Sequence, residues 1–495
     1  MNMSPDTILL LSILVPLAGV AGIVVTGRWP NLRETVSICT GVLLIYLVST
    51  LYRLNGEGVQ IGWISPDLLP GLSLSFQIEP LGLIFSLVAS YLWLVTTVYA
   101  IGYMRGHGEE NQTRFYACFA IAIAAAIGIA HSGNLFTLFI FYEALTLSTY
   151  PLVTHAGTEK AKLGGRTYLG ILLTTSILFL LLAIIGTWYV TGTLDFQAGG
   201  VFDDSSKLAA SILLPLYIFG IGKAAIMPFH RWLPAAMVAP TPVSALLHAV
   251  AVVKAGVFSV LKVCTYIFGF DMLAQLPITD FLLYLAGGSV IIASLVAMRQ
   301  DNLKARLAYS TISQLSYITV GALLVSSSGA LGGALHIAMH AFGKITLFFC
   351  AGAIMVAAHK TEISQMHGLG RRMPITMTAF FIGSLSIIGL PPCGGTWSKW
   401  YLMIGTIESE HWLLMVVLMA SSLLNIAYLL PIPLKAFFYD NPEDKGRDPS
   451  IREAPLPSLI ALCITALGCI VLFFYPQPLF DLASQFVEAS RFYGR

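Results

Sequence analysis

Four lysines lie inside apolar stretches of the sequence, at Lys223, Lys254, Lys344 and Lys399. A charged side chain at the centre of a bilayer raises the free energy of insertion by about 2.5–3.5 kcal/mol, so each needs a partner or a task. One acid, Glu143 in NLFTLFIFYEALTLSTYPLV, also lies deep inside an apolar stretch. Burial disfavours the charged form of a lysine, so a buried lysine gains and loses a proton near neutral pH. We therefore expect these residues to relay protons.

Histidines continue the series. In LHIAMHAFGKITLFF, His336, His340 and Lys344 are spaced at i, i+4 and i+8. On an α-helix they share one face within about 80° and cover about 12 Å of the axis. Because histidine titrates near neutral pH and commonly shuttles protons, this stripe favours a proton path. A hydrogen-bonded contact between helices is the alternative for any one of these histidines.

Two further pairs extend the predicted path. Glu143 and Lys223 are expected near mid-membrane on neighbouring helices, where the carboxylate would neutralise the lysine; a static ion pair that holds the helices together is the alternative. His248 and Lys254 are six residues apart, which on an α-helix is about 9 Å along the axis and about 120° around it. We expect them to face different neighbours, so that a proton received on one side is passed sideways.

The sequence predicts neither a metal site nor a cofactor. His336 and His340 have the i, i+4 spacing of a metal-binding pair, but no third ligand or HExxH pattern accompanies them. The seven cysteines never form CxxC and nearly all lie in apolar stretches, which favours buried thiols over iron–sulfur clusters or disulfides. Rossmann glycines and a haem-type pair of histidines are also missing from the sequence.

Two apolar stretches are interrupted, at IMPFHRWLP and GLPPCGG. Four prolines mark these breaks: Pro228, Pro234, Pro391 and Pro392. The breaks are five spans apart, with a lysine before the first and after the second, which is typical of transporters built from inverted repeats. Broken helices free backbone groups, tolerated only against protein or water, so we expect hydrated half-channels. His230 and Arg231 lie in the first break, where capping of the helix ends is favoured over gating.

Membrane-spanning helices must position these residues. Of 495 residues, 57% are hydrophobic and 11% are charged, whereas soluble domains average about 25% charged residues. Because at least about 18 apolar residues span a bilayer as a helix, we predict an all-α polytopic membrane protein whose first span is not a cleaved signal. About fourteen spans are expected, at 7–26, 33–54, 79–101, 113–131, 134–155, 164–190, 207–239, 241–267, 276–298, 303–326, 330–358, 374–405, 411–438 and 455–475.

The loops predict orientation and domain organisation. VQIGW and LSLSFQI alternate apolar and polar residues around a Pro/Gly turn, which predicts a small β-hairpin outside the membrane. Seventeen of the 27 Lys and Arg residues fall in loops on one side and five, Lys262 among them, on the other. The positive-inside rule then places both termini and the hairpin on the outer face. Four parts are expected: 1–112 (helices one to three and the hairpin), 113–267 and 268–440 (two inverted five-helix repeats), and 441–495 (the last helix and tail).

Four segments together resemble a known family: the stretch around Glu143, GKAAIMPFHRWLPAAMVAPTPVSALLHAVAVVKAG, HIAMHAFGKITLFFCAGAI and GLPPCGGTWSKW. Over about 75–440, the sequence resembles the antiporter-like subunits of respiratory complex I and of multisubunit Mrp cation/proton antiporters. MVAPTPVSALLHAVAVVKAG is most similar to the D-type subunit of the Mrp antiporters or a close hydrogenase-linked relative. The short tail DLASQFVEASRFYGR does not resemble the long lateral helix of the largest complex I subunit of this kind.

This resemblance implies roles for the buried residues. Glu143 and Lys223 would form a coupling pair in the first half-channel. A lateral hydrated axis would follow, made of Lys254, His336, His340 and Lys344. The second half-channel would hold Lys399.

Together, these observations predict a proton-translocating membrane subunit of a multisubunit monovalent cation (Na⁺ or K⁺)/proton antiporter, not an enzyme. Its partners would be other membrane subunits, protons and the lipid bilayer of a bacterial plasma (inner) membrane, with no nucleic acid. Because the spans hold no acidic cluster that would cage Na⁺, the cation path is expected in another subunit or along backbone carbonyls. The main alternative is a pumping subunit of a complex I-type NADH:quinone oxidoreductase or of a membrane-bound hydrogenase. A quinone-reducing enzyme and a purely structural scaffold are the others.

Overall fold

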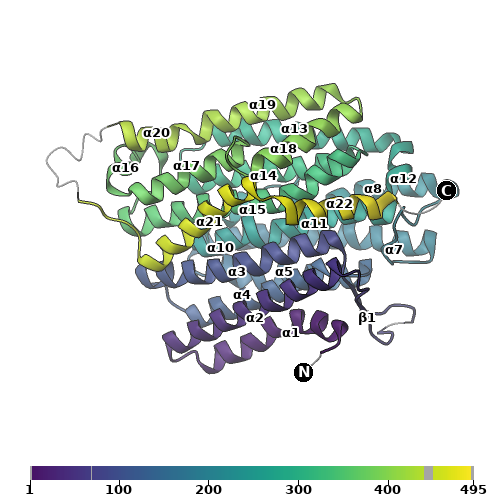
Figure 1. Ribbon diagram of the computed structural model, residues 1–495, viewed down its shortest axis with the longest axis horizontal. Coiled ribbons are helices and arrows are strands. Elements are labelled where there is room, and N and C mark those ends of the chain that lie inside the picture. The colour runs from purple at the N-terminus through teal and green to yellow at the C-terminus, as the bar shows by residue number, and fades with distance from the viewer. Residues whose placement is uncertain (1–2, 69, 440–449, 492–495) are drawn as a thin grey trace.

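Long helices that run side by side make up almost all of the protein (Figure 1). The computed structural model describes residues 3–68, 70–439 and 450–491. Within these residues, eleven helical segments are long and apolar enough to cross a membrane. They are Pro5–Val25 (α1), Pro30–Gly56 (α2), Pro80–Gly106 (α3), Gln112–Ala130 (α4), Leu135–Val153 (α5), Glu159–Thr191, Thr241–Phe268, Pro277–Arg299 (α13), Ser327–Ala358 (α15), Trp412–Phe438 and Leu456–Phe474 (α21). The protein is an all-α polytopic membrane protein, as predicted.

Three of these segments are composite. The segment 159–191 contains α6 (Glu159–Thr175), the π-helical turn η1 (Ser176–Leu180) and α7 (Leu181–Thr191). The segment 241–268 contains α10 (Thr241–Ala245), the π-helical turn η5 (Leu246–Val250), α11 (Val252–Val263) and the π-helical turn η6 (Cys264–Phe268). The segment 412–438 contains α19 (Trp412–Leu429) and α20 (Pro431–Phe438).

The three other predicted spans are also helical, but two are broken and one is polar. The seventh contains α8 (Lys207–Gly220), η3 (Gly222–Ala224), α9 (Trp232–Ala235) and η4 (Ala236–Val238). The tenth is α14 (Leu303–Leu323), and the twelfth is divided into α17 (Pro374–Ile388) and α18 (Gly395–Glu408). Short elements connect the spans: η2 (Asp204–Ser206), α12 (Phe270–Gln275), η7 (Ile363–Gln365) and α16 (Leu369–Arg372). The predicted tail forms a helix, α22 (Gln477–Arg491), that packs on α3 and α15.

Local sequence signals fix where many of these helices begin. Six helices start with a proline at their first position: α1, α2, α3, α13, α17 and α20. Proline suits that position because its φ is already helical and its missing N–H would have no partner there. Asn134, Asn302 and Ser326 cap α5, α14 and α15 by accepting a hydrogen bond from the backbone N–H three residues on. The starts of these spans are therefore encoded locally.

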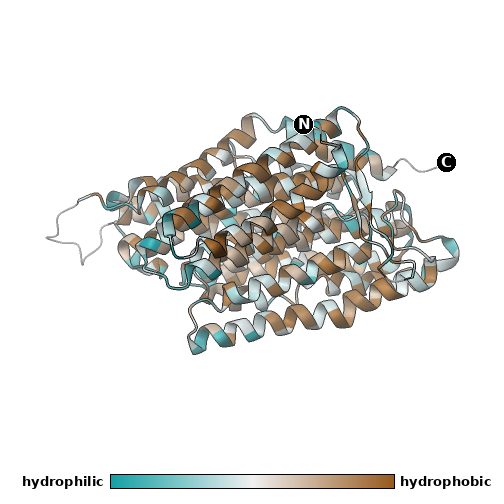
Figure 2. Cartoon of the chain, turned by 90° about the horizontal axis from the view of Figure 1, so that it is seen from below, coloured by the Kyte–Doolittle hydropathy of each residue, from teal (hydrophilic) through white to brown (hydrophobic). Residues whose placement is uncertain are grey.

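The predicted hairpin is present at one end of the bundle. β1 (Gly62–Ile64) pairs with β2 (Ser75–Gln77) in antiparallel register, with Trp63 opposite Phe76. The described chain begins and ends at this same end, whereas α16 and α20 lie at the other (Figure 1). Hydrophilic residues gather in the loops at both ends of the helices (Figure 2). The described chain thus starts and ends at one end of the bundle, as an even number of crossings requires; which end faces outward stays a prediction.

Apolar side chains face outward as well as inward. Leu182, Tyr189 and Leu413 are among many large hydrophobic residues exposed on the bundle surface, where lipid rather than water would surround them. The same reason corrects the expectation of buried cysteines. All seven are free thiols, but Cys39 and Cys463 are exposed on the bundle surface, which is acceptable for an apolar side chain facing lipid.

The first break begins earlier than its prolines. α8 ends at Gly220, a single 3₁₀ turn covers Gly222–Ala224, and helix resumes at Trp232. Lys223 therefore lies inside the break and not before it. A Cβ on Gly222 would lie 2.2 Å from a threonine hydroxyl of α6, so only glycine allows this approach of the backbone. The Gly222 carbonyl accepts two hydrogen bonds, from Ala225 N–H within the turn at 3.0 Å and from Trp232 Nε1 at 3.0 Å, so the indole ties the two sides of the break together.

The second break lies where the sequence predicts it, between α17 and α18. Gly389 at its start has φ +88°, a conformation that glycine adopts readily. Gly394 N–H donates to Cys469 O at 2.8 Å, and Trp397 Nε1 donates to Phe473 O at 2.9 Å. Helix α21 thus covers this break and supplies its hydrogen-bond acceptors.

The four prolines do not all lie in broken backbone. Pro228, Pro391 and Pro392 are in the non-helical segments. Pro234 lies in α9, where the first turn of a helix tolerates proline.

The predicted division of the chain into four parts stays a prediction, and the helix boundaries can be set beside it. α4 begins at Gln112 and η6 ends at Phe268, within one residue of the predicted limits of the first repeat, 113–267. Both broken helices occupy the fourth place in their group of five. The inverted relation between the two groups stays a prediction, and residues 441–449 of the last predicted part lie outside the described residues.

One glycine contact leads to a stability prediction. A Cβ on Gly256 of α11 would lie 2.3 Å from Ala224 N and from Lys223 C, so Gly256→Ala forces the first break away from α11. Overpacking of this kind costs about 1–3 kcal/mol. Gly288→Ala in α13 is the matched control, because nothing lies within 4 Å of its Cβ position. We expect Gly256→Ala alone to lower the melting temperature of the purified protein; equal melting temperatures would contradict this packing.

Candidate functional site

Lys223 is buried against α5. Its Nζ donates to the Tyr142 carbonyl oxygen at 2.9 Å and to Thr146 Oγ1 at 2.6 Å, and lies 3.1 Å from the centroid of the Tyr142 ring. The backbone N–H of Lys223 donates to the Tyr142 hydroxyl at 3.1 Å. Two residues one turn apart on α5 therefore hold the lysine. A carbonyl, a hydroxyl and an aromatic face all favour a cation, so an ammonium here is solvated by protein groups.

Glu143 lies next to this site without bonding the lysine. Among the described residues, Glu143 Oε1 is buried without a hydrogen-bond partner. Because successive helical residues are about 100° apart, α5 turns Glu143 away from the face that Tyr142 and Thr146 present to the break. The two predicted partners are thus on neighbouring elements, as expected, but do not form a direct ion pair.

Lys254 and His340 form a buried pair at the centre of the bundle. Lys254 Nζ of α11 and His340 Nδ1 of α15 are 2.6 Å apart, and both side chains are almost fully buried. His340 Nε2 has no partner within the described part of the chain. One ring nitrogen therefore meets a possible proton donor while the other remains available, which is the arrangement that a proton shuttle needs.

His336 continues the path one turn along α15. Its Nδ1 lies 2.8 Å from Ser398 Oγ of α18, and its Nε2 lies 3.2 Å from Gln314 Oε1 of α14. The His336 and His340 rings stack with centroids 5.7 Å apart, and Tyr317 of α14 stacks on the other side of His336 at 5.8 Å. The predicted stripe on α15 therefore extends onto α14 and α18.

Lys344, the last member of the stripe, points to α14. Its Nζ donates to Ser310 Oγ at 2.8 Å. Tyr428 of α19 also donates to Ser310 Oγ, at 3.0 Å, and its hydroxyl contacts Asn425 Oδ1. A hydroxyl shared by Lys344 and Tyr428 forms a short polar branch from α15 to α19.

Lys399 binds the end of the broken twelfth span. Its Nζ donates to the Ile388 carbonyl at 3.0 Å and to Ser422 Oγ at 3.3 Å. Ile388 is the last residue of α17, and carbonyls at a helix C-terminus carry a partial negative charge that favours a cation. Lys399 Nζ also lies 4.8 Å from the centroid of the Tyr317 ring. The second break therefore provides the acceptor for its own lysine.

His248 and Lys254 both contact α15, so the expectation that they face different neighbours is wrong. The His248 ring packs on Phe348 of α15 at 4.7 Å, and Lys254 also contacts α15. The reason is that the long helix α15 packs both on the π-helical turn Leu246–Val250, which carries His248, and on α11, which carries Lys254. Both ring nitrogens of His248 are buried without a partner among the described residues.

These contacts join some predicted residues and leave others apart. Lys254, His340 and His336 follow one another, and Tyr317 links this row to Lys399. Lys223 stands apart from this row. Its Nζ contacts α5, whereas Lys254, a residue of α11, contacts α15. Hydrogen bonds within the described residues do not connect these two lysines.

Sequence reasoning missed the polar residues of α14. Ser310, Gln314 and Tyr317 are spaced at i, i+4 and i+7, all are buried, and each contacts a predicted relay residue. Residues with that spacing share one face of a helix, so the sequence alone could have indicated a polar face on this span. Ser398 of α18 and Tyr428 of α19 also contact this network, but no helical spacing in the sequence indicated their involvement.

His230 and Arg231 do not act as side-chain caps. Arg231 occupies the N-cap of α9, but its side chain makes no capping hydrogen bond. His230 is half-buried, with its ring 6.3 Å from that of Tyr309 on α14. The favoured interpretation of these residues as helix caps is therefore wrong for the side chains.

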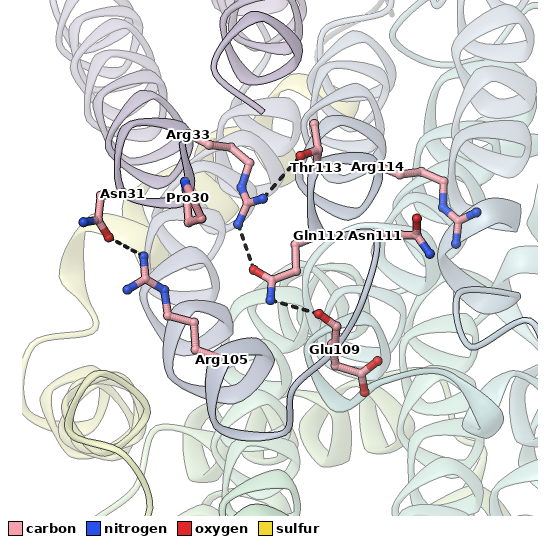
Figure 3. A pocket seen from close by; sticks show the side chains of 9 residues that line it. All are labelled: Pro30, Asn31, Arg33, Arg105, Glu109, Asn111, Gln112, Thr113 and Arg114. Atoms are coloured by element: carbon pink, nitrogen blue, oxygen red, sulfur yellow. Dashed lines mark hydrogen bonds between the residues drawn. The ribbon is translucent and has the colours of Figure 1, made fainter. Parts of the chain in front are cut away.

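A pocket of about 750 Å³ lies at the end opposite the hairpin, away from the predicted relay residues (Figure 3). Arg33 donates to Gln112 at 2.7 Å and to Thr113 at 3.3 Å, and Arg105 donates to Asn31 at 2.6 Å. These bonds tie the ends of α2, α3 and α4 together. The lining holds no relay residue, so we assign this pocket to the packing of the helix ends.

Comparison with known proteins agrees with this arrangement. Residues 132–425 match the family model described as NADH:quinone oxidoreductase/Mrp antiporter, TM. The chain belongs to this family. Residues 63–116 also match the model described as NADH-Ubiquinone oxidoreductase (complex I), chain 5 N-terminus.

Individual members of the NADH:quinone oxidoreductase/Mrp antiporter family are moderately similar. NADH-quinone oxidoreductase subunit N of Desulforudis audaxviator is 30% identical over 84% of this chain and 85% of that protein. NAD(P)H-quinone oxidoreductase chain 5 of Synechocystis sp. is 32% identical over 73% of this chain but only 54% of that protein. In the structure of the Mrp complex from Dietzia sp. DQ12-45-1b, one chain has a TM-score of 0.87 at 21% identity, with 98% of this chain and 97% of that chain covered. This likeness shows a shared fold.

The hydroxyl shared by Lys344 and Tyr428 leads to a second stability prediction. Ser310→Ala removes an acceptor from both residues in a dry interior, which costs about 1–3 kcal/mol. Ser316→Ala, also buried on α14, is the control, because Ser316 Oγ bonds only the Ile312 carbonyl of its own helix. Thermal unfolding should show the larger loss for Ser310→Ala. Equal losses would mean that the Lys344–Ser310 contact contributes nothing to stability.

Proposed function

We propose that this protein is a proton-translocating membrane subunit of a multisubunit monovalent cation/proton antiporter, comparable to the D-type subunit of Mrp complexes. The family and the fold shared with a chain of an Mrp complex support this. The observation that carries the proposal is the buried Lys254–His340 pair, because an amine and an imidazole in direct contact, without a neutralising acid, suit proton transfer better than stability.

The relay begins at the first break. Water in the break delivers a proton to Lys223, and Glu143 tunes the affinity of Lys223 for that proton as it moves nearer or farther. The free Glu143 Oε1 supports such a role, because no other described group holds this oxygen in place. Water bridges the gap from Lys223 to Lys254, and His248, with two unpartnered nitrogens, offers a further stop beside α15.

Lys254 then passes the proton along α15. His340 accepts it at Nδ1 and releases a proton from Nε2, so that its ring returns to the neutral state. His336, Lys344 and Lys399 continue the transfer, with the hydroxyls of Ser398 and Ser310 as intermediate partners. Lys399 gives the proton to the second break, whose backbone is already open.

The protein's setting follows from the same proposal. It acts as a transporter subunit and not as an enzyme, and other membrane subunits are its partners. The basic loops face the cytoplasm of a bacterium, and both termini face outward across the plasma membrane. The exchanged Na⁺ or K⁺ takes a path in another subunit or along backbone carbonyls, because the relay supplies amines and imidazoles but no cage of oxygen ligands.

The alternative is a proton-pumping subunit of a complex I-type NADH:quinone oxidoreductase or a membrane-bound hydrogenase. The name of the Desulforudis audaxviator relative favours it. Either assembly would use the same buried residues of this chain, and the two differ in their partners. Purification in mild detergent decides between them: co-purifying flavin or iron–sulfur subunits favour the alternative, and only further membrane subunits favour the antiporter.

Substitution of the central lysine tests the relay. Lys254→Arg keeps a positive charge beside His340, but an arginine in a protein does not release its proton. We expect proton transport driven by ΔpH in everted vesicles that contain all partner subunits to fall at least about tenfold, which is about 1.4 kcal/mol in barrier height. Lys162→Arg on the exposed start of α6 is the matched control. Undiminished transport by Lys254→Arg would show that Lys254 serves only as a fixed positive charge, which would contradict the relay.

The start of the relay is tested in the same vesicles. Lys223→Ala removes the group that receives the first proton, so antiport should be lost while the complex still assembles. Assembly is checked by co-purification of the partner subunits. Full antiport by Lys223→Ala would refute the proposed entry at the first break.

A further inference from the structure

A second buried group of titratable residues lies at the hairpin end, outside the relay. Lys262 of α11 is fully buried, although the sequence placed it in an outer segment. Lys262 is interior because other parts of the chain cover it: Glu79, the Ser132 carbonyl and the Phe196 ring lie against its Nζ. Lys262 Nζ is 3.0 Å from Glu79 Oε2 and donates to the Ser132 carbonyl at 2.5 Å.

His131 completes this group. It follows α4 directly, is fully buried, and neither ring nitrogen has a partner among the described residues. The hairpin holds it in place: Gln77 N–H donates to the His131 carbonyl at 2.7 Å, and Phe76 forms an isolated bridge with Ser132. An imidazole with two free nitrogens in a dry site loses hydrogen bonds that water would give, so packing alone does not explain it.

A pocket of about 860 Å³ connects this group to the hairpin end of the bundle. Glu79 lines the pocket, together with Gln77 of the hairpin and Phe196, whose ring lies 4.4 Å from Lys262 Nζ. The other titratable residues of the lining are Tyr266 and the exposed Glu488 of α22. Glu79 is thus the member of the group that reaches the pocket, and Lys262 lies behind it.

Helix α11 joins this group to the relay. Lys254 and Lys262 are eight residues apart on α11, which is about 12 Å along the axis and about 80° around it. Phe258 lies between them, 5.6 Å from Lys262 Nζ and packed against Phe85 of α3 at 5.2 Å. One helix therefore carries a central lysine and a second lysine nearer the hairpin, with the Phe258 ring between them in sequence.

We infer that Glu79, Lys262 and His131 form a proton-exchange site that connects the relay to the hairpin end of the membrane; this rests on the proposed function. Lys262 in its ammonium form gives a proton to the Glu79 carboxylate, which leaves both groups neutral. Glu79 then releases the proton to water in the pocket. Lys262 takes its next proton from the relay side, and His131 holds a proton on a free nitrogen during the exchange. In the reverse order, Glu79 takes a proton from water in the pocket and Lys262 passes it to the relay.

A static ion pair is the competing explanation, and paired substitutions separate the two. Removing one member of a buried pair leaves an unpaired charge, whereas neutralising both is well tolerated. Glu79→Gln/Lys262→Gln should therefore assemble normally under either explanation. A proton-exchange site predicts that the double variant transports protons at least tenfold more slowly than the unmodified complex. A static pair predicts unmodified transport, which would overturn the inference.

Controls keep the outcome interpretable. Asp204→Asn/Lys207→Gln neutralises an exposed pair with a spacing of 3.0 Å and should leave transport unchanged. Lys254→Arg is measured in parallel to separate this inference from the proposed function. If Lys254→Arg transports slowly and the Glu79/Lys262 variant transports normally, this inference is overturned and the proposed function stands.

If the double variant does not assemble, His131→Asn replaces it, since none of the ion pairs among the described residues includes His131. We expect it to shift the pH profile of transport; an unchanged profile would overturn the site.

Discussion

Charged groups in the core of a membrane require the protein to supply what water supplies elsewhere. Each of the four lysines predicted to carry protons ends on such a group: two on backbone carbonyls, one on an imidazole and one on a serine hydroxyl. None of these acceptors is a carboxylate. The lysines are thus held without being neutralised, and that condition lets a lysine exchange its proton instead of forming a permanent ion pair.

The broken spans meet this requirement at low structural cost. A helix that ends inside the membrane exposes carbonyls that an unbroken helix would use itself, and Ile388 offers one of them to Lys399. Glycines allow the open backbone to pack closely, as Gly256 does against the first break. Indole N–H groups add hydrogen bonds around the breaks, from Trp232 to the Gly222 carbonyl and from Trp397 of α18 to the Phe473 carbonyl of α21. The breaks therefore create sites for cations while side chains tie the neighbouring segments together.

Helix α15 organises the interior. It packs on α14, α17, α18 and α21 as well as on α11, so residues along one of its faces meet partners from several spans. A single stripe of titratable residues is thereby converted into a branched polar network. The same α11 that supplies Lys254 to the network also carries Lys262 to the hairpin end. Two helices that cross the bundle near its centre (Figure 1) therefore relate the buried path to both breaks and to one membrane surface.

Local chemistry in the sequence determined the spans, the two breaks, the hairpin and the stripe on α15, because hydropathy, proline and helical spacing act over a few residues. Tertiary structure decided which neighbour each side chain meets. Glu143 is turned away from Lys223, and His248 contacts the same helix, α15, as Lys254 does. Lys262 is interior because Glu79, Ser132 and Phe196, all distant in sequence, pack around it. Direction and depth of this kind depend on the rotation and length of packed helices, which residues distant in sequence set together.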